Sequence, residues 1–378
     1  MPINPLGDTM YINFWYPVGT SDQITNEKPF RTRILTLDFV AFRDSDGQAH
    51  VLGDTCVHRG GSLSAGKVVG DCIACPYHGW QYGGDGRCKL VPSLGDVSKI
   101  PARAKVDAYP VQEKYGIVFA FLGDLPEGER PPIYDVDVFE KDDWRANEVV
   151  VFEVDYYYQR SVENGLDPAH NQFVHPKQGA PGLQQDFQEK PIKMENIGDW
   201  GSKFILPFVL EKRNDGLLLE SQVRDPEYLK GGSGYVGPNQ LITWLQFTKE
   251  NMFHQYFFEA PIDENRTRIF FLNMRHFLMD PEQDQRIMDI NMQITQEDVD
   301  VLVKLDPVRT PENNTKEILL PSDLPIVHYR EFLKDWDKRG WRIDMHKLKE
   351  LEGDVAFAIP CPGRRTSKNW VLDEIPTL

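Results

Sequence analysis

The chain has 378 residues, of which 40% are hydrophobic and 26% charged, so it can bury one large core or two ordinary ones. We expect two domains. The formal net charge of −16 argues against nucleic acid as a ligand, because its phosphates would be repelled. An acidic surface instead favours a partner with a complementary basic docking patch.

Nothing in the sequence predicts a membrane span, because no run of about eighteen apolar residues occurs. Residues 1–5 lack the basic and apolar regions of a signal peptide, so we expect a cytoplasmic protein. The five cysteines are an odd number. Two belong to the motif described below, and we expect the other three, Cys72, Cys88 and Cys361, to be reduced and partly buried.

The first third of the sequence has the alternation and turn residues of a β domain. Thr32–Phe42 predicts one strand, and a turn at Asp44–Gly47 leads to a second strand at Ala49–Leu52. Gly83–Gly86 predicts a hairpin turn, and Ile117–Leu122 predicts the last apolar strand of the domain.

Residues 123–132 are rich in glycine and proline and mark the boundary between domains. We therefore expect one domain at residues 1–128, including an N-terminal arm, and another at residues 129–378, including a C-terminal tail.

The second domain combines longer strands with helices. We expect a helix at Tyr158–His175, a flexible loop at Lys230–Gly234 and a long amphipathic helix at Asp284–Leu305. The predicted strands are Val149–Asp155, Phe204–Leu210, Gly216–Val223, Leu241–Phe247, Gln255–Ala260 and Thr267–Met274. This order fits an antiparallel sheet with helices packed on one face, which is an α+β arrangement.

Two Cys/His pairs dominate the β domain. Cys56-Val57-His58 is followed, after sixteen residues, by Cys75-Pro76-Tyr77-His78. Two thiolates and two imidazoles suit a [2Fe–2S] cluster in which the cysteines hold one iron and the histidines the other. Zinc accepts the same four ligands, but zinc fingers keep the cysteines in one pair and the histidines in the other. Because each pair here is mixed, the cluster is favoured.

A second candidate metal site involves His170, His175 and Asp298. The two histidines are five residues apart, so on a regular helix they would point about 140° from each other. Pro176 disfavours helical geometry at His175, which gives a reason for the helix to end there. Asp298 occupies an apolar-stripe position of the predicted long helix, where an unpaired carboxylate is costly. Two histidines and one carboxylate suit non-haem Fe(II) and leave open positions for O₂.

Taken together, these motifs resemble the catalytic α subunit of a Rieske non-haem iron oxygenase of the single-subunit, monooxygenase or demethylase type. The ligand loops at Cys56–Gly61 and Cys75–Trp80 match the family closely, and Asp167, His170 and His175 match its Asp-x₂-His-x₄-His motif. The resemblance implies an all-β Rieske domain followed by a helix-grip catalytic domain.

The resemblance also implies roles for the site residues. Cys56, His58, Cys75 and His78 would hold the [2Fe–2S] cluster, and His170, His175 and Asp298 would hold a mononuclear Fe(II). In a head-to-tail homotrimer, Asp167 would bridge His78 of one subunit to His170 of the next and carry electrons between them. Asn164 is a further catalytic candidate on the same segment.

The expected activity is that of a terminal oxygenase. It would use O₂ to hydroxylate or oxidatively demethylate a small apolar or aromatic molecule. No dinucleotide-binding glycine motif or plant-type ferredoxin cysteine run occurs. Electrons must therefore come from a separate ferredoxin or flavin reductase, with NAD(P)H acting only through that partner. Aromatic cis-dihydroxylation is the alternative, and a non-enzymatic Rieske electron-transfer protein is a third possibility.

Several apolar residues of the second domain are candidates for the wall of a substrate pocket, and each is also an ordinary core candidate. They are Phe173, Ile205, Phe208, Leu210, Trp244, Phe247, Phe257 and Phe258. The loop at Lys177–Gly182 is either a lid over the substrate or a plain surface turn.

Overall fold

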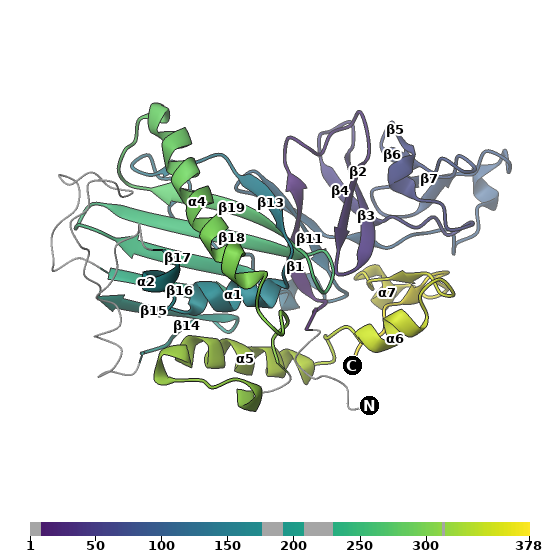
Figure 1. Ribbon diagram of the computed structural model, residues 1–378. Coiled ribbons are helices and arrows are strands. Elements are labelled where there is room, and N and C mark those ends of the chain that lie inside the picture. Colours follow the sequence, from purple (N-terminus) through teal and green to yellow (C-terminus); the bar gives the residue numbers. More distant parts are fainter. Residues whose placement is uncertain (1–8, 176–191, 208–229, 312–313) are drawn as a thin grey trace. The chain divides into compact units, whose positions relative to one another are not determined.

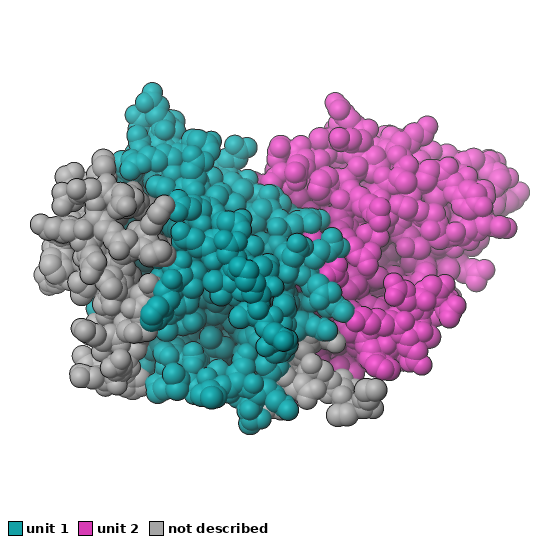
Figure 2. All heavy atoms as spheres, viewed as in Figure 1, with its two compact units in different colours: residues 1–9, 132–259, 264–335 teal, residues 10–131, 260–263, 336–378 magenta. Residues whose placement is uncertain are grey.

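The computed structural model describes residues 9–175, 192–207, 230–311 and 314–378 (Figure 1). The chain forms two compact units (Figure 2). Unit 1 comprises residues 1–9, 132–259 and 264–335, and unit 2 comprises residues 10–131, 260–263 and 336–378. The transition at residues 131/132 lies close to the boundary expected from the linker. Residues 336–378 were expected to belong with the catalytic domain, but they cluster with residues 10–131.

Unit 2 is built from small antiparallel sheets, as the alternating N-terminal sequence predicts. Their strand orders are β1-β11-β10, β2-β3-β4-β9 and β5-β6-β7-β8. The strands are β1 (Phe14–Thr20), β2 (Phe30–Ile34), β3 (Leu37–Arg43), β4 (Ala49–Gly53), β5 (Lys67–Val69), β6 (Cys72–Ala74), β7 (Gln81–Gly83), β8 (Cys88–Leu90), β9 (Ala108–Tyr109), β10 (Val111–Lys114) and β11 (Ile117–Leu122). The β7–β8 hairpin and strands β4 and β11 confirm the sequence-based expectation.

The single strand expected at Thr32–Phe42 is wrong, because a two-residue turn divides it into β2 and β3. Leu35 and Thr36 form this turn with φ of 51° and 69°, a region that side chains rarely adopt. Their N–H groups donate hydrogen bonds to the carbonyls of Pro261 and Ile262, at 2.7 and 3.0 Å. These bonds supply a long-range reason for a turn that residue preferences do not indicate.

The C-terminal segment packs on the strands of unit 2. It contains α6 (Met345–Glu350), α7 (Gly363–Thr366) and the parallel pair β20 (Phe357–Ala358) and β21 (Asp373–Glu374). Arg364 donates two hydrogen bonds, at 2.7 and 2.8 Å, to the carboxylate of Asp107, which is 1% exposed. The indole of Trp370 lies against both Lys105 and Arg364, with the two cationic groups 4.3 and 4.8 Å from the ring centre. A buried bidentate ion pair of this kind holds the segment in one place.

Unit 1 contains an eight-stranded sheet in the order β12-β19-β18-β17-β16-β15-β14, with β13 also paired to β19. The strands are β12 (Arg145–Ala146), β13 (Val150–Val154), β14 (Glu195–Ile197), β15 (Gly201–Pro207), β16 (Lys230–Val236), β17 (Gln240–Gln246), β18 (Met252–Pro261) and β19 (Thr267–Arg275). The antiparallel sheet of the predicted α+β arrangement is confirmed. The strand expected at Gly216–Val223 lies outside the described residues.

Helices α1 (Tyr158–Leu166) and α4 (Asp284–Leu302) lie across this sheet (Figure 1). A side chain added at Gly165 would collide with Leu241, so α1 approaches β17 closely. Leu241 is paired with Phe257 in the sheet, and Phe257 packs against a buried cluster that includes Leu302 of α4. Because residues paired across strands share a face, α1 and α4 cover the same face of the sheet.

The flexible loop expected at Lys230–Gly234 is wrong, because these residues belong to β16 in the interior of the sheet. A Cβ at Gly232 would lie 2.0 Å from the carbonyl oxygen of Phe204, and one at Gly234 would lie 2.9 Å from the Trp244 ring. The glycines therefore permit close packing of neighbouring strands rather than flexibility.

The helix expected at Tyr158–His175 is also wrong, because it is two helices, α1 and the short α2 (Asn171–Val174). Asp167 has φ −86° and ψ 109°, which is extended backbone. Pro168 follows it and disfavours helical geometry at the preceding residue. The long helix α4 confirms the amphipathic prediction but ends at Leu302. A further helix, α5 (Leu324–Asp337), packs through Tyr329 on Tyr235 of β16.

Candidate metal centres

The two Cys/His loops of unit 2 have the same backbone geometry. In the first, the Cys56 N–H donates to the Gly61 carbonyl at 2.8 Å, and the Gly60 N–H donates to the Cys56 carbonyl at 2.9 Å. In the second, the Cys75 N–H donates to the Trp80 carbonyl at 2.8 Å, and the Gly79 N–H donates to the Cys75 carbonyl at 3.0 Å. Gly60 and Gly79 both have φ of 70°, which favours glycine. Each loop therefore closes through its own main chain.

The two thiols of these loops are buried together, while the two imidazoles are exposed together. Cys56 and Cys75 are 2% and 3% exposed, and burial raises the pKa of Cys56. The rings of His58 and His78 lie 4.4 Å apart, and both residues are exposed. His58 stacks on Trp80 at 4.6 Å with an interplanar angle of 5°.

This donor set fits a [2Fe–2S] cluster held by two thiolates on one side and two imidazoles on the other. A Cβ at Gly61 would lie 3.0 Å from the Cys75 sulfur, so glycine keeps the space beside that ligand open. Cys72, Cys88 and Cys361, like the two ligand cysteines, form no disulfide. Cys72 is partly buried, whereas Cys88 and Cys361 are buried, and the expectation that these thiols are reduced stays a prediction.

Tyr82 is a partner of the cluster site that the sequence did not reveal. Its hydroxyl lies 3.2 Å from the sulfur of Cys56, and the residue is fully buried in β7. Burial strongly raises the pKa of Tyr82, so the hydroxyl stays protonated and can donate to a thiolate. The residues are 26 positions apart, and no spacing rule connects them.

The second candidate centre lies between α2 and α4 in unit 1. His170 directly precedes α2, His175 directly follows it, and Asp298 lies on α4. One ligand atom from each of the three lies within 4.8 Å of the others. The Asp298 oxygen is 3.1 Å from the Nε2 of His175 and 3.6 Å from the Nε2 of His170. His170 is still helical, but α2 ends at Val174 and His175 has φ −114° and ψ 68°, so the helix end expected before Pro176 is what allows both imidazoles to face one carboxylate.

The outer nitrogen of each imidazole has its own acceptor. The Nδ1 of His170 lies 2.6 Å from the backbone carbonyl oxygen of Asp167, and the Nδ1 of His175 lies 3.0 Å from a carboxylate oxygen of Glu297. An acceptor at Nδ1 favours the tautomer whose Nε2 lone pair points inward. Glu297 directly precedes Asp298 in the sequence, and this adjacency is the signal that could have pointed to it.

This set of side chains fits a divalent iron ion. One carboxylate oxygen of Asp298 is buried and has no hydrogen-bond donor, which is costly unless a cation is present. Burial lowers the pKa of His175, but Asp298 and Glu297 raise it by more, so the net shift is upward. Two histidines and one carboxylate are a typical non-haem iron ligand set with open positions.

Asp167 and Asn164 lie just before the iron site. The Asp167 carboxylate accepts a hydrogen bond from the Ala169 N–H at 2.7 Å, and burial raises its pKa. The carbonyl of Asn164 accepts from the Asp167 N–H at 3.1 Å. Within this chain the partner of the His170 imidazole is therefore the backbone carbonyl of Asp167, not its carboxylate. The bridge from that carboxylate to another subunit stays a prediction.

The structure places the apolar wall candidates at different sites. Phe173 and Ile205 are 72% and 50% exposed, whereas Phe247 is buried against Phe277. Phe257 lies on the face covered by α4, while Trp244 and Phe258 alternate to the opposite face. Phe208, Leu210 and the lid candidate Lys177–Gly182 lie outside the described residues.

Both halves of the chain match known protein families. Residues 14–110 match the Rieske [2Fe-2S] domain, and residues 154–339 match the vanillate O-demethylase oxygenase C-terminal domain. Within the described residues, no helix combines the length and apolarity that crossing a bilayer requires.

Among curated proteins, the chain is similar to the oxygenase component of 3-ketosteroid-9-alpha-monooxygenase from Mycolicibacterium smegmatis. The two are 30% identical over 244 residues, covering 63% of this chain and 58% of that one. The α subunit of phenoxybenzoate dioxygenase from Ectopseudomonas oleovorans is 33% identical over 191 residues, covering 47% of this chain and 46% of that protein. The matches to the steroid monooxygenase components span 44% to 58% of those relatives' length.

Among solved structures, NdmA of Pseudomonas putida CBB5 with caffeine has the same fold. It superposes with a TM-score of 0.72 at 23% identity, over 87% of this chain and 91% of that one. This similarity supports the all-β domain followed by an α+β domain with an antiparallel sheet.

Proposed function

Because this chain belongs to the Rieske non-haem iron oxygenases and carries both domains typical of them, we propose that it is a terminal oxygenase. It would use O₂ and electrons from a separate ferredoxin or flavin reductase to monooxygenate a small organic substrate by hydroxylation or oxidative demethylation.

The observation that carries this proposal is the convergence of His170, His175 and Asp298 on one point, with a buried carboxylate oxygen left without a donor. An electron carrier needs only the cluster loops. A second, separately built iron site in unit 1 has a purpose only if iron binds a reactant there.

The protein's own residues prepare that site. When bound, the mononuclear iron supplies open coordination positions for O₂, and the cluster supplies an electron. The Asp167 carbonyl and the Glu297 carboxylate orient the imidazoles of His170 and His175. Asp298 contributes the negative charge that favours a divalent ion over a proton.

The assembly and electron route belong to the same proposal. Its supports are the exposed His58 and His78 and the position of Asp167, next to His170. We propose a homotrimer in which Asp167 connects His170 to His78 of a neighbouring subunit.

Dihydroxylation of an aromatic ring is the second candidate function. It is favoured by the similarity to the phenoxybenzoate dioxygenase α subunit, while the steroid monooxygenase component favours the first candidate. Reaction under ¹⁸O₂ separates them, because a dihydroxylated product contains two labelled atoms and a monooxygenated product at most one.

Counting iron and acid-labile sulfide in anaerobically purified protein tests the two-centre arrangement. We expect about three irons and two sulfides per chain, and about two irons with two sulfides in a His170→Ala, His175→Ala variant. Replacing the exposed His346 by alanine is the matched control and should change neither count.

About two irons and two sulfides in the unchanged protein, even after Fe(II) reconstitution, would contradict the oxygenase proposal and leave an electron carrier. Zinc without sulfide would contradict both centres.

A further inference from the structure

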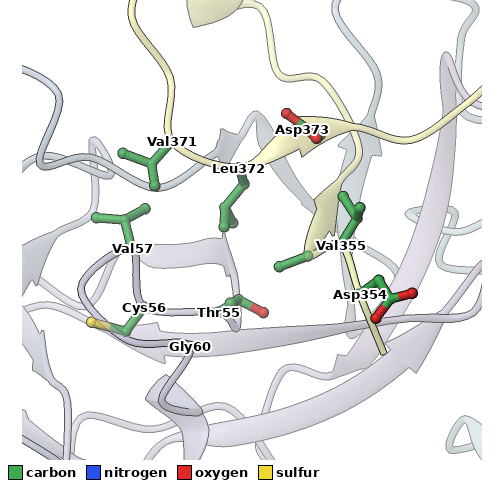
Figure 3. Close-up of a pocket in the computed structure, with 10 residues that line it drawn as sticks. Thr55, Cys56, Val57, Gly60, Asp354, Val355, Val371, Leu372 and Asp373 are labelled. Atoms are coloured by element: carbon green, nitrogen blue, oxygen red, sulfur yellow. The ribbon is translucent and has the colours of Figure 1, made fainter. Parts of the chain in front are cut away.

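A pocket of about 340 Å³ lies in unit 2 between the first ligand loop and the C-terminal segment (Figure 3). One side is formed by residues 55–57 and Gly60, and the other by residues 354–356 and 371–373. The volume is at the small end of the range for ligand sites and suits one long side chain better than a large molecule. Because Val57 lies between the ligands Cys56 and His58, anything bound here is adjacent to the cluster loop.

The walls of this pocket are mainly apolar. Figure 3 shows Val57 and Val371 opposite each other, with Leu372 directed between the two sides. Val371 is 42% exposed, whereas Leu372 is only 9% exposed. Such walls suit the methylene stem of a lysine or arginine, which packs on apolar surface while its charged end stays near water.

Carboxylates lie at the margins of the pocket. Asp354 and Asp373 line it, and both are exposed. The β20–β21 pairing places Phe357 opposite Asp373 and so brings the two acidic segments together. Neither carboxylate forms an ion pair within the part of the chain that the structure describes, whereas the nearby Glu374 lies 3.6 Å from Arg364.

The charge of the pocket margin therefore selects a cationic group. Two exposed carboxylates without a cation attract a basic side chain, and the net charge of −16 attracts a basic protein over a longer range. Arg59 is exposed on the ligand loop and carries the opposite sign. The basic side chain is thus favoured on the side of the C-terminal segment.

We propose that this pocket receives a lysine or arginine side chain of the electron-donor protein and so docks that protein beside His58. The inference rests on the proposed function and names the surface through which its electrons arrive. Docking makes and breaks no covalent bond. One electron passes from the reduced donor, which is oxidised, to the cluster, which is reduced.

The test uses mitochondrial ferricytochrome c as a lysine-rich redox probe. The electron transfer is measured in the direction opposite to the proposed one, from this protein to the probe. The protein is reduced with dithionite and desalted, and its cluster then gives one electron to the haem iron in a stopped-flow experiment. The rates are compared for the unchanged protein, Asp354→Asn/Asp373→Asn and Val371→Trp. Val371→Trp fills the pocket and keeps both carboxylates. Asp22→Asn/Glu27→Gln is the charge-matched control, because both residues are exposed elsewhere in unit 2.

At low ionic strength we expect the second-order rate to fall about three- to tenfold in both pocket variants and to stay unchanged in the control. In about 0.5 M salt, the second-order rate of the charge variant should equal that of the unchanged protein. Equal rates in all proteins would overturn the proposal. A slower rate only in the charge variant would also overturn it, because a diffuse acidic surface would then explain the effect without the pocket.

The proposed function is tested separately in the same samples. The visible spectrum of the oxidised protein and its bleaching by dithionite report the cluster before any rate is measured. A protein without that spectrum contradicts the proposed function, whereas a normal spectrum with unchanged rates contradicts only the docking pocket.

Discussion

His175 and Glu297 are joined by a hydrogen bond of 3.0 Å between the imidazole Nδ1 and a carboxylate oxygen. The other nitrogen of the same ring lies 3.1 Å from Asp298. Glu297 and Asp298 are adjacent on α4, so one helix supplies both the acceptor at Nδ1 of this imidazole and the carboxylate that would share a metal ion with it.

Replacing Glu297 by glutamine should weaken Fe(II) binding about 10- to 100-fold, because the amide can present an N–H to the ring and no longer favours the inward lone pair. Anaerobic Fe(II) titration measures the affinity. Asp300→Asn, an exposed change on the same helix, should leave it unaltered. Equal affinities for the two variants would show that Glu297 does not orient the ligand.

Binding of Fe(II) should weaken at low pH. Although burial lowers the pKa of His175, Asp298 and Glu297 raise it above its ordinary value. Below that pKa the metal must displace a proton, so the affinity should fall about tenfold per pH unit. The same shift stabilises the iron-free protein below the unfolded pKa of about 6.5, and this contribution is lost as the pH rises through the folded pKa. A pH-independent affinity between pH 5 and 8, by titration, would contradict this expectation.

Replacing Tyr82 by phenylalanine should lower the reduction potential of the cluster by about 20–60 mV. The hydroxyl lies 3.2 Å from the Cys56 sulfur, and a hydrogen bond to sulfur favours the more negative, reduced cluster. The range corresponds to a net hydrogen bond of about 0.5–1.5 kcal/mol. A redox titration followed by electron paramagnetic resonance measures it. Tyr77→Phe removes a hydroxyl from a residue that is 61% exposed and should leave the potential unchanged.

Replacing Asp167 by alanine should lower turnover by at least about 100-fold while both metal centres stay loaded. The side chain would then no longer connect His170 to a neighbouring subunit. Asp155→Ala removes an exposed carboxylate from unit 1 and is the control. Normal, fully coupled turnover in Asp167→Ala, with iron and sulfide counted in the same sample, would contradict the bridge.

Asp284 should stabilise unit 1 in a pH-dependent way. Hydrogen bonds from Arg145, at 2.7 and 2.5 Å, together with Arg275, lower the pKa of Asp284 to about 2. The stabilisation is complete above the unfolded pKa of about 3.9 and is lost as the pH falls towards 2.

Asp284→Asn should therefore reduce the free energy of unfolding by about 1 kcal/mol at pH 7, a value discounted because the carboxylate is partly exposed. The difference should vanish near pH 2. Denaturation of the two proteins across this pH range measures it. Asp289→Asn, exposed on the same helix, should show no such trend.

The residues of the two candidate metal centres could be singled out from the sequence because local chemistry restricts them. The mixed Cys/His pairs disfavoured a zinc finger, and an acidic residue on an apolar stripe pointed to Asp298. Histidines five residues apart required a distorted or ended helix, and the helix does end before His175, while Pro168 adds a second break upstream of both histidines.

Other features depend on contacts between distant parts of the chain. The hydroxyl of Tyr82 reaches Cys56 only because β7 lies beside the ligand loops. Glycine is required at position 232 of β16 because a Cβ there would collide with the backbone of the neighbouring strand. The turn at Leu35 is held by the distant carbonyl of Pro261. Sequence periodicity carries no information about such neighbours.

The interrupted course of the chain through unit 2 has a consequence for how the protein is made. Residues 10–131 are translated first, but residues 336–378, which include Arg364 opposite the buried Asp107, leave the ribosome only after the whole of residues 132–335. Until then Asp107 lacks its guanidinium partner, and one side of the first ligand loop is uncovered. The emerging chain therefore cannot complete the unit that holds the cluster until the other unit has been synthesised.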